Sequence, residues 1–171
     1  MRLDSHGITT DLPAGWEGRI ALRRSPDPAG RSGFETRSPE GVGPTGHPAE
    51  AAFPVAHLAN FPLPGDRGDF GSGAVDLMTA EDALVVLAEY GPECAGTPLF
   101  SHRGLPSALR PDMFSGSALQ RAIPGQAGTQ IWCTVANRAF CVYVVLGRQA
   151  NANRLLPQVR STLSATRISA R

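Results

Sequence analysis

The clearest hydrophobic pattern in the chain lies in residues 129–147, where two apolar runs flank Asn137 and Arg138. We expect a two-residue turn at this position to join two antiparallel strands, with Val135 opposite Phe140. This register predicts one wholly apolar face, which must belong to the core: Ile131, Cys133, Val135, Phe140, Val142, Val144 and Leu146. The other face is amphipathic and available to a helix or a partner: Trp132, Thr134, Cys141, Tyr143 and Val145.

Alternation with a period of two predicts further strands upstream. Residues 53–61 form a strand that places His57 on one face and Asn60 on the other, and the prolines that follow end it. Helix and strand compete for residues 83–90, but the run is only about eight residues long before Gly91, which favours a strand. Residues 8–24 indicate a short strand, a turn and a second strand.

Helical spacing is confined to two places. A short helix is predicted within residues 69–78, and a terminal helix begins near Asn153, since Pro157 is tolerated only close to a helix start. A last short strand, residues 165–169, can return to the sheet. The pattern as a whole therefore predicts the α+β class, an antiparallel β-sheet flanked by helices.

Residues 25–50 are mostly Pro, Gly, Ser, Thr and charged types, which cannot bury an apolar face, so we expect a flexible loop there. The full 171 residues otherwise fit a single domain with a core of its own.

Composition narrows the functional classes. All 16 basic residues are Arg, the formal net charge is +1, and no window gathers Arg into a patch, which argues against a nucleic-acid partner. The absence of Lys removes Schiff-base, P-loop and lysine-base chemistry. No stretch reaches the length of a membrane span and the start does not resemble a signal peptide, so we expect a cytoplasmic protein.

Motif analysis predicts no cofactor and no metal site. The three cysteines, Cys94, Cys133 and Cys141, lack metal or redox spacing, and the last two are expected on opposite faces of the hairpin and therefore unpaired. The four histidines are scattered. Gly71-Ser72-Gly73 precedes a predicted helix, but it lacks the third glycine of a dinucleotide fingerprint, so a helix-initiating turn is favoured over phosphate binding.

One histidine has candidate chemistry. His57 lies on a predicted strand, and Glu89 of a neighbouring strand could pair with it for proton transfer, with Asn60 nearby. The alternative is a hydrogen-bonded structural histidine. A different candidate is the pair Trp132 and Tyr143, which could form an exposed docking patch because aromatic residues are enriched at interfaces.

The chain resembles PsbP-like α/β sandwiches in its Leu12-Pro13-Ala14-Gly15-Trp16 segment, its antiparallel strands ending in residues 139–146, and its closing helix followed by Thr166-Arg167-Ile168. It is also similar to actinobacterial proteins of this layout. The resemblance implies an antiparallel sheet flanked by helices that is used mostly for binding rather than catalysis.

Two functional hypotheses follow. The first is a non-enzymatic protein-binding module, a chaperone or accessory subunit, whose partner is another protein or a second copy of the chain, bound through Trp132 and Tyr143 or through the 25–50 loop. The alternative is a small-molecule-binding protein or enzyme with a pocket near His57 and Glu89, and Asn60 is a candidate binding residue there.

Overall fold

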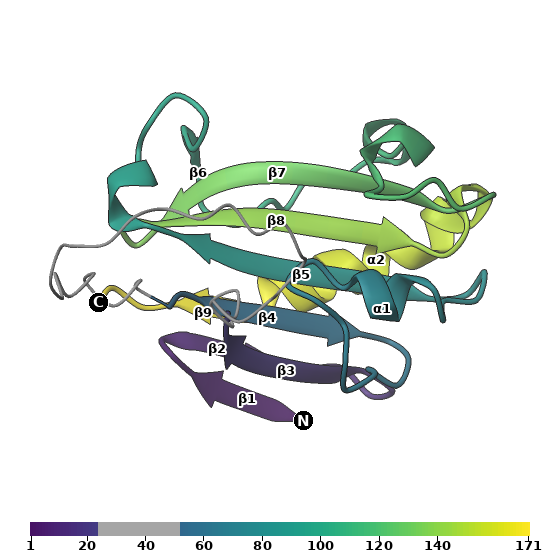
Figure 1. Cartoon of the computed structure of the whole chain (residues 1–171), viewed down its shortest axis with the longest axis horizontal. Coiled ribbons are helices and arrows are strands. Elements are labelled where there is room, and N and C mark those ends of the chain that lie inside the picture. Colours follow the sequence, from purple (N-terminus) through teal and green to yellow (C-terminus); the bar gives the residue numbers. More distant parts are fainter. Residues whose placement is uncertain (24–51) are drawn as a thin grey trace, which may run out of the picture.

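The computed structural model describes residues 1–23 and 52–171, and these form two β-sheets and one long helix (Figure 1). The small sheet has the order β1-β2-β9 and the large sheet the order β3-β4-β5-β8-β7-β6. The predicted loop at 25–50 lies outside the described residues. The strands have these bounds: β1 Arg2–Ser5, β2 Ile8–Asp11, β3 Glu17–Leu22, β4 Pro54–Ala59, β5 Ala83–Tyr90, β6 His102–Arg103, β7 Ala127–Val135, β8 Arg138–Leu146 and β9 Thr166–Ile168.

Two α-helices and four 3-10 turns complete the described chain: α1 Ser72–Val75, α2 Ala152–Ser164, η1 Pro92–Cys94, η2 Pro111–Met113, η3 Gly116–Ala118 and η4 Gln149–Asn151. The helix predicted near Asn153 is confirmed as α2, and Pro157 is accepted in its second turn with its ring exposed. The short helix predicted within residues 69–78 is confirmed as the single turn α1. No helix in the described ranges is long and apolar enough to cross a membrane.

Strands β7 and β8 form the predicted hairpin, but its turn is one residue earlier than expected. Ala136 and Asn137 occupy the turn with φ angles of 49° and 60°, and Val135 pairs with Arg138. The predicted turn at Asn137 and Arg138 was wrong because Arg138 is a strand residue whose side chain is held in the protein interior. Since the register shifts by two residues, every side chain keeps its predicted face.

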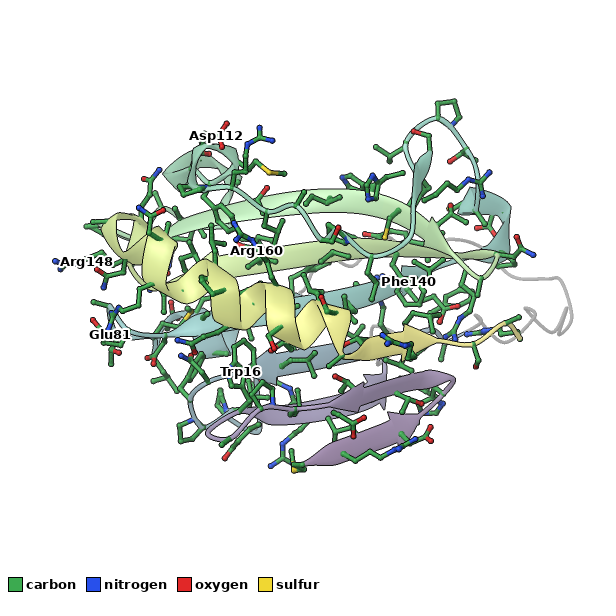
Figure 2. The ribbon with its side chains drawn as sticks, turned by 180° about the vertical axis from the view of Figure 1, so that it is seen from behind. Trp16, Glu81, Asp112, Phe140, Arg148 and Arg160 are labelled. Carbon is green, nitrogen blue, oxygen red and sulfur yellow. The ribbon has the colours of Figure 1, made fainter. Side chains whose placement is uncertain are left out.

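The two faces of the large sheet are covered differently. On the face that carries Phe140, here called the Phe140 face, α2 and the small sheet pack against the strands through Trp16, Leu58, Val142, Leu155 and Leu156. Figure 2 shows α2 lying across this face. Gly18 of β3 permits the small sheet to approach, because a Cβ there would lie 2.4 Å from a methyl carbon of Leu3.

The opposite face, here called the His57 face, is covered by α1 and by the chain between β4 and β5. Phe61, Val75, Val86 and Tyr143 belong to its core cluster. Figure 1 shows α1 on this side of the sheet and α2 behind it.

The predicted fold class was wrong. Helices do not flank the sheet: α2 covers the Phe140 face alone, and α1 is four residues long. The strands predicted in residues 8–24 exist as β2 and β3 but belong to different sheets, and β9 returns to β2 rather than to the large sheet. The prediction also lacked β1, and β6 pairs with β7 in parallel. Pairing between chain ends is a long-range event that local alternation does not encode.

Candidate functional site

The structure does not bring the predicted pair His57 and Glu89 together. His57 of β4 pairs with Val86 of β5, and Glu89 follows three residues later, so the two side chains project from opposite faces of the sheet. The predicted acid–base pair was therefore wrong. Successive side chains of a strand alternate between the two faces of the sheet, and paired residues share a face. Glu89 lies an odd number of residues after Val86, the partner of His57, so it lies on the other face.

Glu89 is committed to a buried ion pair on the Phe140 face. Its two carboxylate oxygens accept hydrogen bonds from Nε and Nη2 of Arg138 at 3.0 and 2.6 Å, and both side chains are 3% exposed. Arg138 also donates to the carbonyl oxygens of His6, Gly7 and Ser169, which joins both sheets. Because every strong acceptor and donor of the pair is used, it has a structural role.

Tyr143 and Trp132 share the His57 face, but they do not form the exposed pair that the sequence predicted. Tyr143 is buried, whereas Trp132 is half-buried in an aromatic cluster with Tyr90 and Phe100, its ring centroid 5.3 Å from each. Asn60 donates to the carbonyl of Glu81 at 3.0 Å and accepts from the amide of Ala83 at 2.7 Å. The side-chain amide of Asn60 thus joins the end of β4 to the start of β5.

The cysteines follow the prediction. Cys133 and Cys141 lie on opposite faces of the sheet, all three thiols are free, and burial raises the pKa of Cys133 and of Cys141 to about 12. The two buried thiols are therefore protonated and unreactive at neutral pH. Among residues 1–23 and 52–171, no three His, Cys, Asp or Glu side chains are grouped as metal ligands.

The candidate site is a cavity of about 550 Å³ on the His57 face, here called the His57 pocket. It lies between the β3–β4 edge of the sheet and the loop that follows β4. Its lining residues are Ala21, Leu22, Arg23, Val55, His57, Gly65, Asp66, Arg67, Gly68 and Asp69.

The loop at residues 64–69 forms one wall of the pocket and is closed by its own arginine. Nη1 of Arg67 donates to the carbonyl oxygens of Pro64 and Gly65 at 3.0 and 3.2 Å, while its Nε is buried with no hydrogen-bond partner in the described chain. The loop rests on α1 at Gly73, where a Cβ would lie 2.3 Å from the carbonyl oxygen of Asp66. Gly73 therefore serves packing, and Gly71, with φ 76°, forms the helix-initiating turn.

Arg23 reaches the pocket from the end of β3. Its backbone amide is fixed by the carbonyl of Phe53 at 2.9 Å, and its guanidinium lies 4.7 Å from the Tyr90 ring centroid and 5.8 Å from that of Phe70. These cation–π contacts hold the side chain in place. Its Nε and Nη2 are buried and have no hydrogen-bond partner among the described residues.

His57 is 4% exposed, and neither ring nitrogen has a hydrogen-bond partner within the described residues. Burial lowers its pKa to about 4, and the charge of Arg67 acts in the same direction. Hydrogen bonding from the backbone of Gly68 and Asp69 opposes both, although neither contact has the geometry of a regular hydrogen bond to a ring nitrogen. The imidazole is therefore neutral at pH 7, with one nitrogen able to donate and the other able to accept.

The pocket thus collects buried nitrogen atoms that need partners: both ring nitrogens of His57, two guanidinium nitrogens of Arg23 and one of Arg67. Guanidinium groups only donate hydrogen bonds, so the partners missing from Arg23 and Arg67 are acceptors, whereas neutral His57 has one ring nitrogen that needs an acceptor and one that needs a donor. Burial, and then the charge of Arg19, lower the pKa of Arg67, yet an arginine remains cationic at neutral pH. Asp66 and Asp69, which also line the pocket, are exposed to solvent.

Sequence reasoning found His57 but missed Arg23 and Arg67. The alternation in residues 53–61 placed His57 on the correct face, but the arginines stand at a strand end and in a Gly-rich loop, where no periodic pattern applies. Comparison of the chain with protein-family models, with curated proteins and with solved structures found no match.

Proposed function

We propose that the protein is a small-molecule-binding protein that holds an anion with oxygen acceptors in the His57 pocket. The observation that carries the proposal is a set of buried nitrogens of His57, Arg23 and Arg67 around one cavity that have no hydrogen-bond partner among residues 1–23 and 52–171. A buried polar group without a partner costs on the order of 1–3 kcal/mol, so a ligand that supplies acceptors recovers this free energy on binding.

The chemistry of the donors supports a carboxylate or a phosphate. A planar guanidinium offers paired N–H groups to such an anion, and hydrogen bonds to a charged acceptor are the stronger kind. A neutral His57 adds one donor without adding charge. The carboxylate once expected beside it, Glu89, is bound to Arg138 on the other face, so the proposal is for binding rather than proton transfer.

Isothermal titration with acetate and with inorganic phosphate, at constant ionic strength, tests the proposal. We expect saturable 1:1 binding of at least one anion that weakens tenfold or more in Arg67→Gln and in Arg23→Gln, because each loses a charge-assisted hydrogen bond. Arg148→Gln is the matched control, since this exposed arginine lies outside the lining of the pocket and the substitution changes net charge equally. Equal weakening in all three variants, or no saturation in the wild type, would refute the proposal.

A second candidate function, self-association, rests on the aromatic cluster. Leu99 is 59% exposed and precedes Phe100, whose ring centroid lies 5.3 Å from that of the half-buried Trp132. Exposed apolar surface beside aromatic residues is typical of docking sites. Light scattering over a range of concentrations should give a dimer mass that Leu99→Ser or Trp132→Ala reduces to a monomer mass. A monomer at every concentration would rule this candidate out.

A further inference from the structure

A second cavity, of about 270 Å³, lies on the same face of the sheet, here called the Tyr143 cavity. Its larger lining side chains are aromatic or aliphatic, namely Phe70, Val75, Leu119, Ile123 and Tyr143, and Ser72, Asp76, Gln120 and Arg121 complete the lining. An exposed ion pair between Asp76 and Arg121 stands at its rim. Burial raises the pKa of Tyr143, so its hydroxyl remains protonated at neutral pH. The cavity therefore suits an apolar group rather than a charged one.

One side chain connects the two cavities. The ring of Phe70 lies edge-on to Tyr143 at 6.3 Å between centroids and lies beneath the guanidinium of Arg23 at 5.8 Å. Phe70 lines the Tyr143 cavity, and the residue before it, Asp69, lines the His57 pocket. Phe70 is half-buried in the loop that leads to α1. Phe70 therefore lies between the two cavities, against Tyr143 of one and Arg23 of the other.

The strand register fixes their separation. His57 of β4 is paired with Val86 of β5, which is paired with Tyr143 of β8. With neighbouring strands about 4.8 Å apart, His57 and Tyr143 are separated by about 10 Å across one row of the sheet. This is the length of a short alkyl chain or of a ring on a short linker.

We infer that the ligand is an amphipathic carboxylate, whose anionic head occupies the His57 pocket and whose apolar chain or ring enters the Tyr143 cavity past Phe70. The inference rests on the proposed function and specifies its ligand class. The head contacts the nitrogens of Arg23 and Arg67 that have no partner in the described part of the chain, and the ligand's apolar part contacts the aromatic and aliphatic walls. Burial of apolar surface supplies affinity that the small head alone lacks.

A series of probes with one head and different chains tests this inference. Acetate, butyrate, hexanoate and octanoate are titrated into the full chain by calorimetry, and octanoate is the member whose extended chain approaches the separation of about 10 Å. Each methylene that enters the Tyr143 cavity should tighten binding about fourfold, so three such methylenes should give a gain on the order of 50-fold. Equal dissociation constants across the series would overturn the inference while leaving anion binding in the His57 pocket intact.

Two variants separate the halves of the site. Ile123→Trp places a large side chain in the Tyr143 cavity and should abolish the gain from chain length while acetate binds as before. Arg67→Gln should weaken every member of the series, and its failure to do so would refute the proposed function itself. If Ile123→Trp leaves the chain-length gain unchanged, the chain binds elsewhere and the inference fails.

Methyl NMR of the wild-type protein gives a readout that does not depend on the folding of a variant. Octanoate should shift the methyl signals of Val75 and Ile123, which line the Tyr143 cavity, whereas acetate should leave them in place. The methyls of Val142 and Leu156, in the core of the Phe140 face, serve as controls and should not move. Shifts with acetate as large as those with octanoate, or none with octanoate, would contradict the inference.

Discussion

The two faces of the large sheet differ in whether their buried polar groups have hydrogen-bond partners in the described chain. On the Phe140 face, Arg138 and Glu89 satisfy each other and the backbone carbonyls around them, and Thr166 bonds to Thr10 at 3.0 Å. On the His57 face, His57, Arg23 and Arg67 carry buried nitrogens that have no partner in the described chain. Within the described residues, the polar groups of the Phe140 face are paired, whereas those three side chains of the His57 face have nitrogens without a partner.

The difference follows from what covers each face. A 13-residue helix and a second sheet close the Phe140 face with continuous apolar side chains. Among the described residues, the His57 face is covered by a single helical turn and by the chain around it, and it carries the His57 pocket and the Tyr143 cavity. Native proteins leave few buried polar groups unsatisfied, and a cluster of them beside a cavity indicates a binding site rather than a folding element. The Phe140 face thus serves stability, and we propose that the His57 face serves binding.

The largest expected effect is on the Phe140 face. Arg138→Ala should lower the free energy of unfolding by about 3–5 kcal/mol, because it leaves the carboxylate of Glu89 buried and deprives three backbone carbonyls of a donor. Urea denaturation measures the change, and Arg148→Ala, at an exposed position, should remain within about 0.5 kcal/mol of the wild type. A loss below 1 kcal/mol for Arg138→Ala would show that the pair is not needed to join the sheets.

A smaller effect is expected from pH on the His57 face. The unfolded chain protonates His57 near its ordinary pKa of 6.5, but the folded protein does so only near 4, so the unfolded state gains protons first as the pH falls. The free energy of unfolding therefore has its full value, as far as His57 is concerned, above pH 6.5 and decreases as the pH falls toward 4. About 2 kcal/mol is lost by pH 5.

Comparison with His57→Leu isolates this contribution from that of the carboxylates, which titrate in both proteins. Urea denaturation at pH 7 and at pH 5 should show the wild type losing about 2 kcal/mol more than the variant over this interval. Equal losses in the two proteins would mean that His57 has an ordinary pKa and is not buried as described.

The smallest effect has the opposite sign. At pH 7, His57→Leu should raise the free energy of unfolding by about 1 kcal/mol, because it replaces an unsatisfied buried imidazole with an apolar side chain. The same substitution should weaken anion binding in calorimetry. A variant that is more stable but binds the anion less well is the result expected for a binding residue. A lower free energy of unfolding in His57→Leu would instead make His57 a structural histidine.

Much of the large sheet could be predicted from the sequence, because alternation reports which side of a strand is buried. The alternation of apolar and polar residues assigned the β7 and β8 side chains to the correct faces. It also placed His57 on the correct face of β4. It failed where the outcome depends on distant residues. Arg138 was assigned to a turn because its partner Glu89 lies 49 residues away, and β9 joins β2 from the far end of the chain.

The candidate site was predictable only in part, for the same physical reason. The strand pattern could locate His57, but the convergence of Arg23 and Arg67 on it depends on how the loop at 64–69 closes on its own carbonyls. The faces of Tyr143 and Trp132 were foreseeable, yet their burial was not, because it depends on the packing of Phe70, Leu119 and Phe100 over them.

Nitrogen NMR of the histidine side chains, recorded at pH 7 with and without acetate or phosphate, tests whether the His57 pocket binds an anion. We expect a neutral His57 whose ring nitrogen signals shift on addition of an anion, because one of them gains an acceptor, while those of the exposed His6 and His102 do not. A His57 ring that is protonated at pH 7, or that responds to neither anion, would refute anion binding at this pocket.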